Sequence, residues 1–130
     1  MKKAFFVMLL LLMSTVSPCS AESWQIVGNE LGTDRDYYVD SDSAWYDGLV
    51  NGGGLAKVMS KDTGYSVILS LRFVDNKDGA FDVAITSGSA YNPDGNLLYG
   101  TDMNFRHHAG ANSILAKVCH AMVKSNENKK

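Results

Sequence analysis

The sequence predicts an α+β fold: an antiparallel meander sheet of about six strands, with one C-terminal helix packed across one face. Two observations predict this fold. After residue 22, apolar residues recur at every second position along most of the chain, which is the period of a strand with one buried face. Over residues 113–124 the period changes to that of an amphipathic helix. A sheet with one apolar face and a helix with one apolar stripe can bury each other, so we expect them to pack together.

Six segments with strand periodicity follow one another, separated by turns rich in glycine, asparagine and aspartate. The segments expected to form strands are Trp24–Val27, Tyr37–Val39, Leu55–Lys61, Tyr65–Phe73, Phe81–Ile85 and Leu97–Phe105. Short turns between antiparallel strands favour a meander. The three glycines within Asn51–Gly54 are expected to form a loose bend or a bulge ahead of the strand that starts at Leu55.

One helix is expected after the last strand. Ser113 or Asn112 can cap its N-terminus. Its apolar stripe consists of residues at spacings i, i+3, i+4 and i+7, namely Leu115, Val118, Cys119 and Met122. Lys124 lies near the C-terminal end, where a cation suits the helix dipole. The tail Ser125–Lys130 is polar, and we expect it to fray.

The first 21 residues have the layout of a secretory signal peptide. Lys2 and Lys3 precede the apolar run Ala4–Met13, and small residues precede a cleavage point after Ala21. The apolar run is shorter than the roughly 18 residues needed to span a bilayer. We therefore expect cleavage of residues 1–21, a single domain over residues 22–130 and no transmembrane segment in that mature chain.

The sequence leaves the localisation of the exported protein open between the periplasm, the cell surface and the extracellular medium. A lipoprotein signal is the alternative to simple cleavage, because Cys19 stands where the lipidated cysteine would have to be. The residue before a lipidated cysteine is normally small and unhindered, whereas here it is Pro18. The sequence therefore favours export without a lipid anchor.

The composition of the predicted mature chain excludes some functions. Its 10 basic and 14 acidic residues do not favour phosphate binding, so we expect no nucleic acid partner. Cys119 is its single cysteine, so no internal disulfide can form. On the helix stripe Cys119 is expected to be a small buried apolar side chain. The alternative is an exposed thiol that links two chains, and the oligomeric state stays open.

Several motifs, taken in their order along the chain, carry a resemblance to a known family. They are Trp24, Tyr37–Asp40, the turn Asp47–Gly48, Arg72–Phe73, the turn Tyr91–Gly95 and Ser113–Cys119. The chain resembles the bacterial surface-adhesin protein E-like domain family over nearly all of its mature length. The resemblance implies an exported sheet of about six strands with a C-terminal helix, exposure at the envelope or surface, and, as in the members that gave the family its name, adhesion to host proteins.

One departure from the family pattern concerns the cysteine. In surface-adhesin domains the helix cysteine is paired with a cysteine of the sheet, but the matching region here, around Phe73–Asn76, has none. The resemblance therefore implies that Cys119 packs the helix against the sheet as an unpaired residue.

The histidines, aspartates and potential nucleophiles of the sequence form no recognisable metal-binding or catalytic motif. His107 and His108 are adjacent, so their side chains diverge in a strand or a helix and do not form one metal site. The aspartates within residues 34–42 suggest calcium, but Val39 and Trp45 stand where an EF-hand loop needs glycine and glutamate. No serine, cysteine or lysine lies in a recognisable nucleophile motif. We expect no enzyme activity, no catalytic residue, no metal and no cofactor.

The sequence favours an exported, non-catalytic binding module of the bacterial cell envelope or surface, acting in adhesion or protein recognition. The partner would be a host or envelope protein. Trp45 and Tyr46 are the residues proposed for an aromatic binding patch, because they precede the Asp47–Gly48 turn and cannot both face inward on an extended segment. The alternative is a periplasmic protein that binds a small ligand, a haem or a hydrophobic molecule, between helix and sheet.

Overall fold

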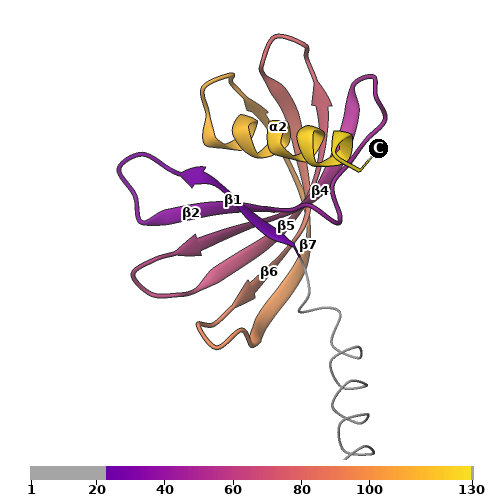
Figure 1. Ribbon diagram of the computed structural model, residues 1–130. Helices are drawn as coiled ribbons and strands as arrows, with labels where there is room; N and C mark the ends of the chain where they lie inside the picture. The colour runs from indigo at the N-terminus through magenta and orange to yellow at the C-terminus, as the bar shows by residue number, and fades with distance from the viewer. Residues whose placement is uncertain (1–22, 130) are drawn as a thin grey trace, which may run out of the picture.

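Seven strands and one helix account for most of the chain in the computed structural model, which describes residues 23–129 (Figure 1). The strands are β1 (Trp24–Asn29), β2 (Arg35–Asp40), β3 (Trp45–Tyr46), β4 (Asn51–Ser60), β5 (Ser66–Asp75), β6 (Phe81–Tyr91) and β7 (Leu97–Ala109), and the helix is α2 (Ile114–Glu127). The predicted signal peptide, its cleavage point after Ala21 and the alternative anchor at Cys19 lie outside the described residues.

The strands form one antiparallel sheet in the order β1-β2-β4-β5-β6-β7, and β3 pairs with β4 beside this path. The predicted antiparallel meander is confirmed for six strands, although their ends differ from the predicted ones by a few residues. The seventh strand, β3, was not predicted, because its two residues are too few to show a period.

The predicted bend at Asn51–Gly54 is wrong. These residues are the first four of β4 and are fully paired with β5. The glycines are required because neighbouring groups occupy the space of their missing side chains. A Cβ at Gly52 would overlap the ring of Phe73, and one at Gly53 would lie 2.8 Å from Nε1 of Trp45.

The two faces of the sheet differ in burial. We call the face with Leu71, Phe73 and Val83 the inner face; these side chains are at most 3% exposed. The opposite face, with Arg72 and Ala84, is the outer face. The buried core combines inner-face residues with residues of α2 and of the connecting segments, namely Val39, Ala44, Ala56, Leu71, Phe73, Phe81, Val83, Ala109, Ala116, Val118, Cys119 and Met122.

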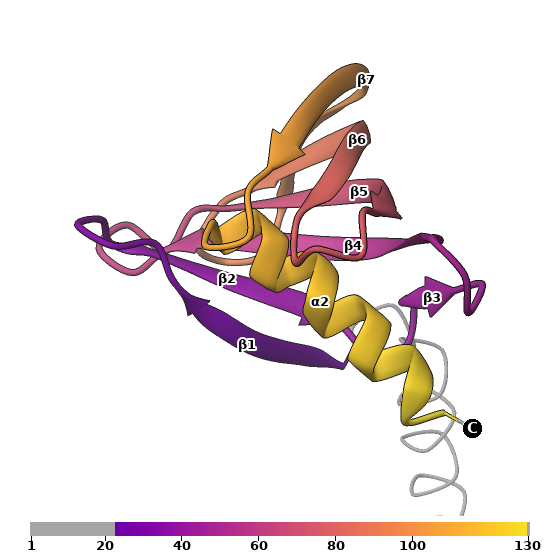
Figure 2. The same ribbon diagram turned by 90° about the horizontal axis from the view of Figure 1, so that it is seen from above.

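The helix α2 begins where the sequence places a cap. Of the two predicted candidates it is Ser113 whose hydroxyl accepts a hydrogen bond from the N–H of Ala116, at 3.1 Å. The helix contacts β1, β2, β3 and β4, and Figure 2 shows β6 and β7 extending beyond it. Every residue of β7 before Ala109 is accordingly exposed. Within residues 23–129, no helix combines the length and apolarity needed to cross a bilayer.

The end of the helix does not fray as predicted. Ser125 is buried, and the side-chain amide of Asn126 donates to the carbonyl oxygen of Tyr46 at 3.2 Å. The ammonium of Lys129 donates to the carbonyl oxygens of Asp42 and Ala44, at 2.9 and 2.8 Å. These polar contacts hold the end of the chain against the segment around β3, and an apolar period cannot reveal them.

Candidate functional site

A row of five residues crosses the outer face of the sheet from β3 to β7. Trp45 lies opposite Gly53, Gly53 opposite Arg72, Arg72 opposite Ala84, and Ala84 opposite Arg106. Directly opposite residues in an antiparallel pair project from the same face. The register therefore places one aromatic and two guanidinium side chains on one side of the molecule, although they are up to 61 residues apart in the chain.

Large and small side chains alternate along this row. The indole of Trp45 covers Gly53. Arg72 and Arg106 are separated only by Ala84, and their strands lie about 10 Å apart because each strand spacing is about 4.8 Å. Four residues of the row border an open groove of about 810 Å³, which we call the outer groove: Trp45, Arg72, Ala84 and Arg106. Its lining comes from β3, β4, β5, β6 and β7 and the turn after β3.

The two guanidinium groups in the outer groove are unpaired. Arg72 and Arg106 are both exposed. Within residues 23–129, neither forms an ion pair or donates a side-chain hydrogen bond to a protein acceptor. Elsewhere on the surface Arg35 faces Glu30 at 3.6 Å. The free positive charge of the groove thus comes from these two arginines.

The two carboxylates that border the groove already have partners. Oδ1 of Asp82 lies 2.7 Å from Nδ1 of His108, and this hydrogen bond lowers the pKa of Asp82. Oδ1 of Asp47 accepts hydrogen bonds from the backbone N–H groups of residues 49–51, of which that of Leu49 does most to lower the pKa of Asp47. Both acids are therefore held as carboxylates by local donors, and neither neutralises an arginine.

The predicted aromatic pair does not form one patch. Trp45 is 42% exposed and lines the outer groove. Tyr46 points to the other side of β3, where its ring stacks on Phe73 at 6.4 Å between centroids and its hydroxyl donates to the carbonyl oxygen of Leu49 at 2.7 Å. Alternation along the strand separates the two residues. Trp45 stays a candidate for binding, and Tyr46 belongs to the edge of the core.

The sequence reasoning missed Arg72, Arg106 and Asp82 as functional candidates of the groove, and it considered His108 only as a metal ligand. Each occupies a polar position of an alternating strand, and this was the available signal. The signal does not say which polar positions of different strands lie side by side, because that depends on the register of pairs between distant segments.

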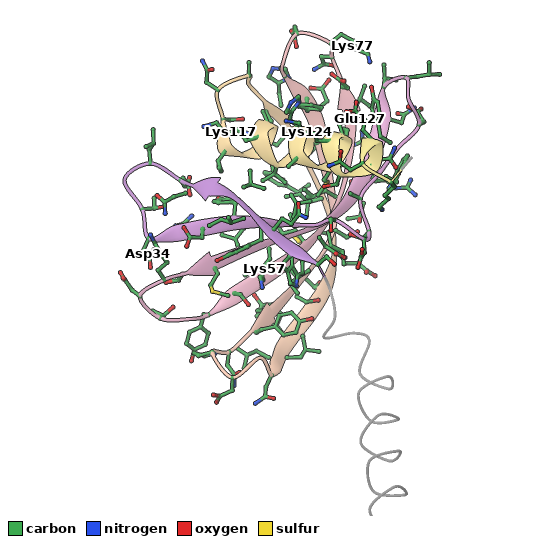
Figure 3. The ribbon with its side chains drawn as sticks, viewed as in Figure 1. Asp34, Lys57, Lys77, Lys117, Lys124 and Glu127 are labelled. Carbon is green, nitrogen blue, oxygen red and sulfur yellow. The ribbon has the colours of Figure 1, made fainter. Side chains whose placement is uncertain are left out.

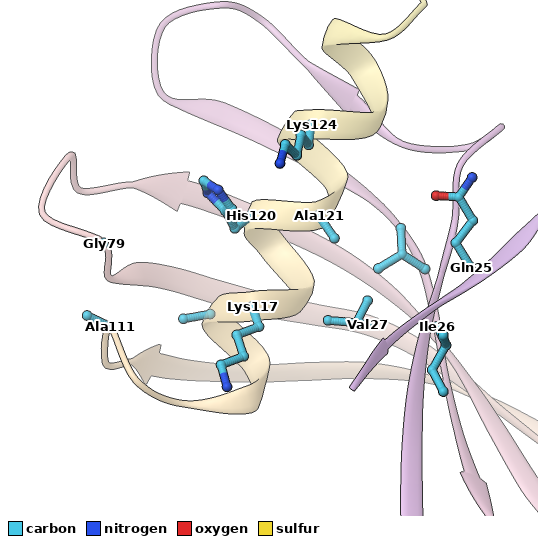
Figure 4. A pocket seen from close by; sticks show the side chains of 11 residues that line it. Gln25, Ile26, Val27, Gly79, Ala111, Lys117, His120, Ala121 and Lys124 are labelled. Atoms are coloured by element: carbon cyan, nitrogen blue, oxygen red, sulfur yellow. The ribbon is translucent and has the colours of Figure 1, made fainter. Parts of the chain in front are cut away.

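A second cavity, of about 460 Å³, lies between α2 and β1. Figure 4 shows Lys117, His120 and Lys124 on successive turns of the helix along it, and Figure 3 shows both lysines projecting from α2. The apolar part of the lining comprises Ile26, Val27, Val39, Ala111, Ala116 and Ala121. Within the described part of the chain, neither lysine has a carboxylate within 4 Å. This cavity combines apolar walls with a cationic rim.

Cys119 lies in the core with no exposed surface and has no disulfide partner within residues 23–129. Burial, and to a smaller extent the negative charge of Asp75, raises the pKa of its thiol to about 12. The thiolate is the reactive form of cysteine, so the fold keeps this residue inert. It belongs to the buried core cluster that also contains Leu71 and Phe73 of the sheet.

The histidines considered for metal binding are dispersed. His107 projects from the inner face beside Phe105, with the rings 6.2 Å apart, and His108 projects from the outer face. His120 lies on α2, at the second cavity. In the range from residue 23 to residue 129, no three His, Cys, Asp or Glu side chains are arranged to hold a metal ion.

The aspartates considered for calcium bind groups of the protein instead. Asp34 accepts a hydrogen bond from the hydroxyl of Ser60, which lowers the pKa of Asp34. Oδ1 of Asp40 accepts from the backbone N–H groups of Ser23 and Asp42, at 3.2 and 3.1 Å. These carboxylates stabilise the turns at the two ends of β2.

No family model matches the chain, and neither a curated protein nor a solved structure matches it. The resemblance to the surface-adhesin protein E-like domains therefore stays a prediction. Function has to be argued from the geometry of the two sites.

Proposed function

We propose that this chain is an exported, non-catalytic binding module of the bacterial cell envelope or surface, and that its outer groove recognises a partner protein. The observation that carries the proposal is the exposed Trp45 beside two unpaired arginines. Tryptophan and arginine are enriched at protein interfaces and among the residues that dominate binding energy. A groove of this composition on a rigid sheet is suited to recognition.

The proposal takes α2 to lie across the inner face, so that the outer face is available to a partner. The contacts of the helix with β1 to β4, and the shared core of Val118 and Met122 with Leu71, support this placement. The surface-adhesin resemblance points in the same direction, with a host or envelope protein as the partner.

The lining of the outer groove supports recognition over catalysis. It contains the pair Asp82 and His108, which is the arrangement that activates a nucleophile in many hydrolases. However, among the described residues, 23–129, the side chains bordering the groove include no serine, threonine, cysteine or lysine that this pair could activate. The pair is more simply a hydrogen-bonded contact between β6 and β7 at the rim of the groove.

The proposal is tested by comparing three forms of the protein immobilised at equal density: wild type, Trp45→Ala and Leu31→Ala. Leu31 is 95% exposed in the turn after β1, is not among the residues that line the groove, and serves as a matched apolar control. We expect envelope or host-matrix proteins retained by wild type and Leu31→Ala to be lost with Trp45→Ala. Equal retention by all three forms would contradict the assignment of the groove.

A second candidate function is the binding of a small hydrophobic ligand in the periplasm. The observation that favours it is the cavity between α2 and β1, whose apolar walls and two lysines suit a molecule with an apolar body and an acidic end. Displacement of a fluorescent fatty acid and an absorbance titration with haem would test it. We expect Ala121→Phe, which fills the cavity, to abolish the binding. A flat response of the wild type to both ligands would remove this candidate.

A further inference from the structure

We propose that the partner inserts a carboxylate side chain between Arg72 and Arg106, and that an apolar residue next to this carboxylate packs on Trp45. The inference rests on the proposed function and names the partner chemistry of the same groove: a protein segment in which an aspartate or glutamate adjoins an apolar residue.

The geometry of the arginines fits a shared carboxylate. A guanidinium is a planar fork of N–H donors that matches a carboxylate with two parallel hydrogen bonds. Arg72 and Arg106 stand about 10 Å apart at the backbone, since one strand separates them. Ala84 between them carries only a methyl group, so the space above it is open to an incoming side chain. Two long arginine side chains can converge on an oxyanion there.

Both arginines are able to bind a carboxylate from a partner, because no group of the described residues 23–129 occupies their N–H donors. Within residues 23–129, both guanidiniums lack an acceptor, whereas the carboxylates of Asp47 and Asp82 are occupied by local donors. The protein therefore presents ten unsatisfied N–H donors on two side chains at this point, and a carboxylate would satisfy up to four of them.

The charge of the groove favours a singly charged anion. Asp47 and Asp82 border the groove together with the two arginines, so its net charge is small. A phosphate carries close to two negative charges at neutral pH and would be repelled more strongly by these carboxylates. A carboxylate carries one negative charge, so these two acidic side chains would repel it less than they would repel a phosphate.

The aromatic end of the row supplies the second contact. Trp45 is 42% exposed and Val74 is 41% exposed, and both border the outer groove. An apolar side chain packed against the indole would remove this surface from water, and the apolar contact and the carboxylate would together fix the orientation of the bound segment.

The experiment is an NMR titration of the full chain with two blocked tripeptides, Phe-Glu-Phe and Phe-Gln-Phe, and separately with inorganic phosphate. The signals followed are the indole N–H of Trp45 and the Nε–H groups of Arg72 and Arg106. The variants are Arg72→Gln and Arg106→Gln, with Arg35→Gln as a matched control because Arg35 already faces Glu30.

We expect the Glu peptide to shift all three signals and the Gln peptide to bind about tenfold more weakly or worse, because hydrogen bonds between charged groups are stronger than neutral ones. Arg72→Gln and Arg106→Gln should each weaken the Glu peptide about tenfold, and Arg35→Gln should leave its affinity unchanged. Equal binding of the two peptides would overturn the inference, as would binding of phosphate in preference to the Glu peptide.

The result separates this inference from the proposed function. If the peptides do not discriminate but Trp45→Ala still abolishes capture of a partner, the groove is the binding surface and the carboxylate assignment is wrong. If capture is also insensitive to Trp45→Ala, both proposals are wrong.

Discussion

The indole of Trp45 lies directly over Gly53, so that a Cβ at Gly53 would sit 2.8 Å from Nε1 of Trp45 and 2.5 Å from the carbonyl oxygen of Leu71. The carbonyl oxygen of Leu71 can move away from a new Cβ only if the backbone of β5 shifts, which costs free energy. We therefore expect Gly53→Ala to lower the free energy of unfolding by about 1–3 kcal/mol, the usual cost of overpacking. It should also shift the tryptophan emission, because the indole is displaced.

Urea unfolding followed by fluorescence measures both effects. Gly110→Ala is the matched control, since a Cβ at Gly110 would have no neighbour within 4 Å. The close approach of Trp45 would be refuted if the two substitutions had the same effect on stability.

Met122 tests the contact between helix and sheet. Its side chain has no exposed surface and belongs to the core cluster with Leu71 and Phe73. Met122→Ala removes buried methylene groups and leaves a cavity, so we expect a loss of about 2–5 kcal/mol in the free energy of unfolding. Lys117→Ala, at an exposed position of the same helix, should change it by less than about 0.5 kcal/mol. A similar small effect at Met122 would mean that the helix is not docked there.

The helix cap is tested by two neighbouring substitutions. Ser113→Ala removes the oxygen that accepts the N–H of Ala116, and we expect it to destabilise the protein by about 1 kcal/mol. Asn112→Ala should have little effect, because Asn112 makes no capping bond within the described residues. Thermal unfolding by circular dichroism compares the two. A larger effect at Asn112 would assign the cap to the wrong residue.

Cys119 should resist alkylation in the folded protein. Since the pKa of the thiol is raised to about 12, the fraction of thiolate at pH 8 is about a thousandfold lower than in an exposed cysteine with an ordinary pKa. Iodoacetamide at pH 8 should leave Cys119 unmodified in the folded protein, as measured on the tryptic peptide 118–124. The same treatment in about 8 M urea, which unfolds the protein, should modify this peptide fully. Equal labelling in both conditions, or a disulfide-linked dimer through Cys119, would contradict the buried position.

The pair Asp82 and His108 predicts a pH effect. The hydrogen bond from His108 lowers the pKa of Asp82, so its stabilising contribution is present above the ordinary aspartate pKa and is lost as the pH falls through the lowered value. In His108→Ala we expect the pKa of Asp82 to rise toward 3.8. A carboxyl-carbon NMR titration measures it, with Asp47 as an internal control because its pKa is set by backbone donors. An unchanged Asp82 would show that His108 is not its partner in solution.

Local patterns were sufficient to predict most of the fold. Leu69, Leu71 and Phe73 repeat with the period of a half-buried strand, and Val118 and Met122 repeat with the period of a helix; both periods follow from backbone geometry alone. The glycines after Asn51 were wrongly predicted to form a bend. Glycine is needed there because Phe73 and Trp45, which come from other segments of the chain, occupy the space of the missing side chains.

The candidate site was less accessible from the sequence. Trp45 was identified by its residue type, but its relation to Arg72 and Arg106 depends on four successive registers. The register also shifts between β5 and β6, where Ser70 faces Ser87 and Leu71 faces Ile85. The single extra residue on β6 reverses which side chains share a face beyond that point, and alternation alone cannot locate such a bulge.

Trp45, Arg72 and Arg106 take no part in the buried core, although Phe73 and Val83 next to this row do. Replacing any of the three exposed side chains leaves the interior intact. The specificity of the proposed binding module can therefore change through single substitutions without loss of folding. Descendants of one ancestral domain could share the same interior and still recognise unrelated targets.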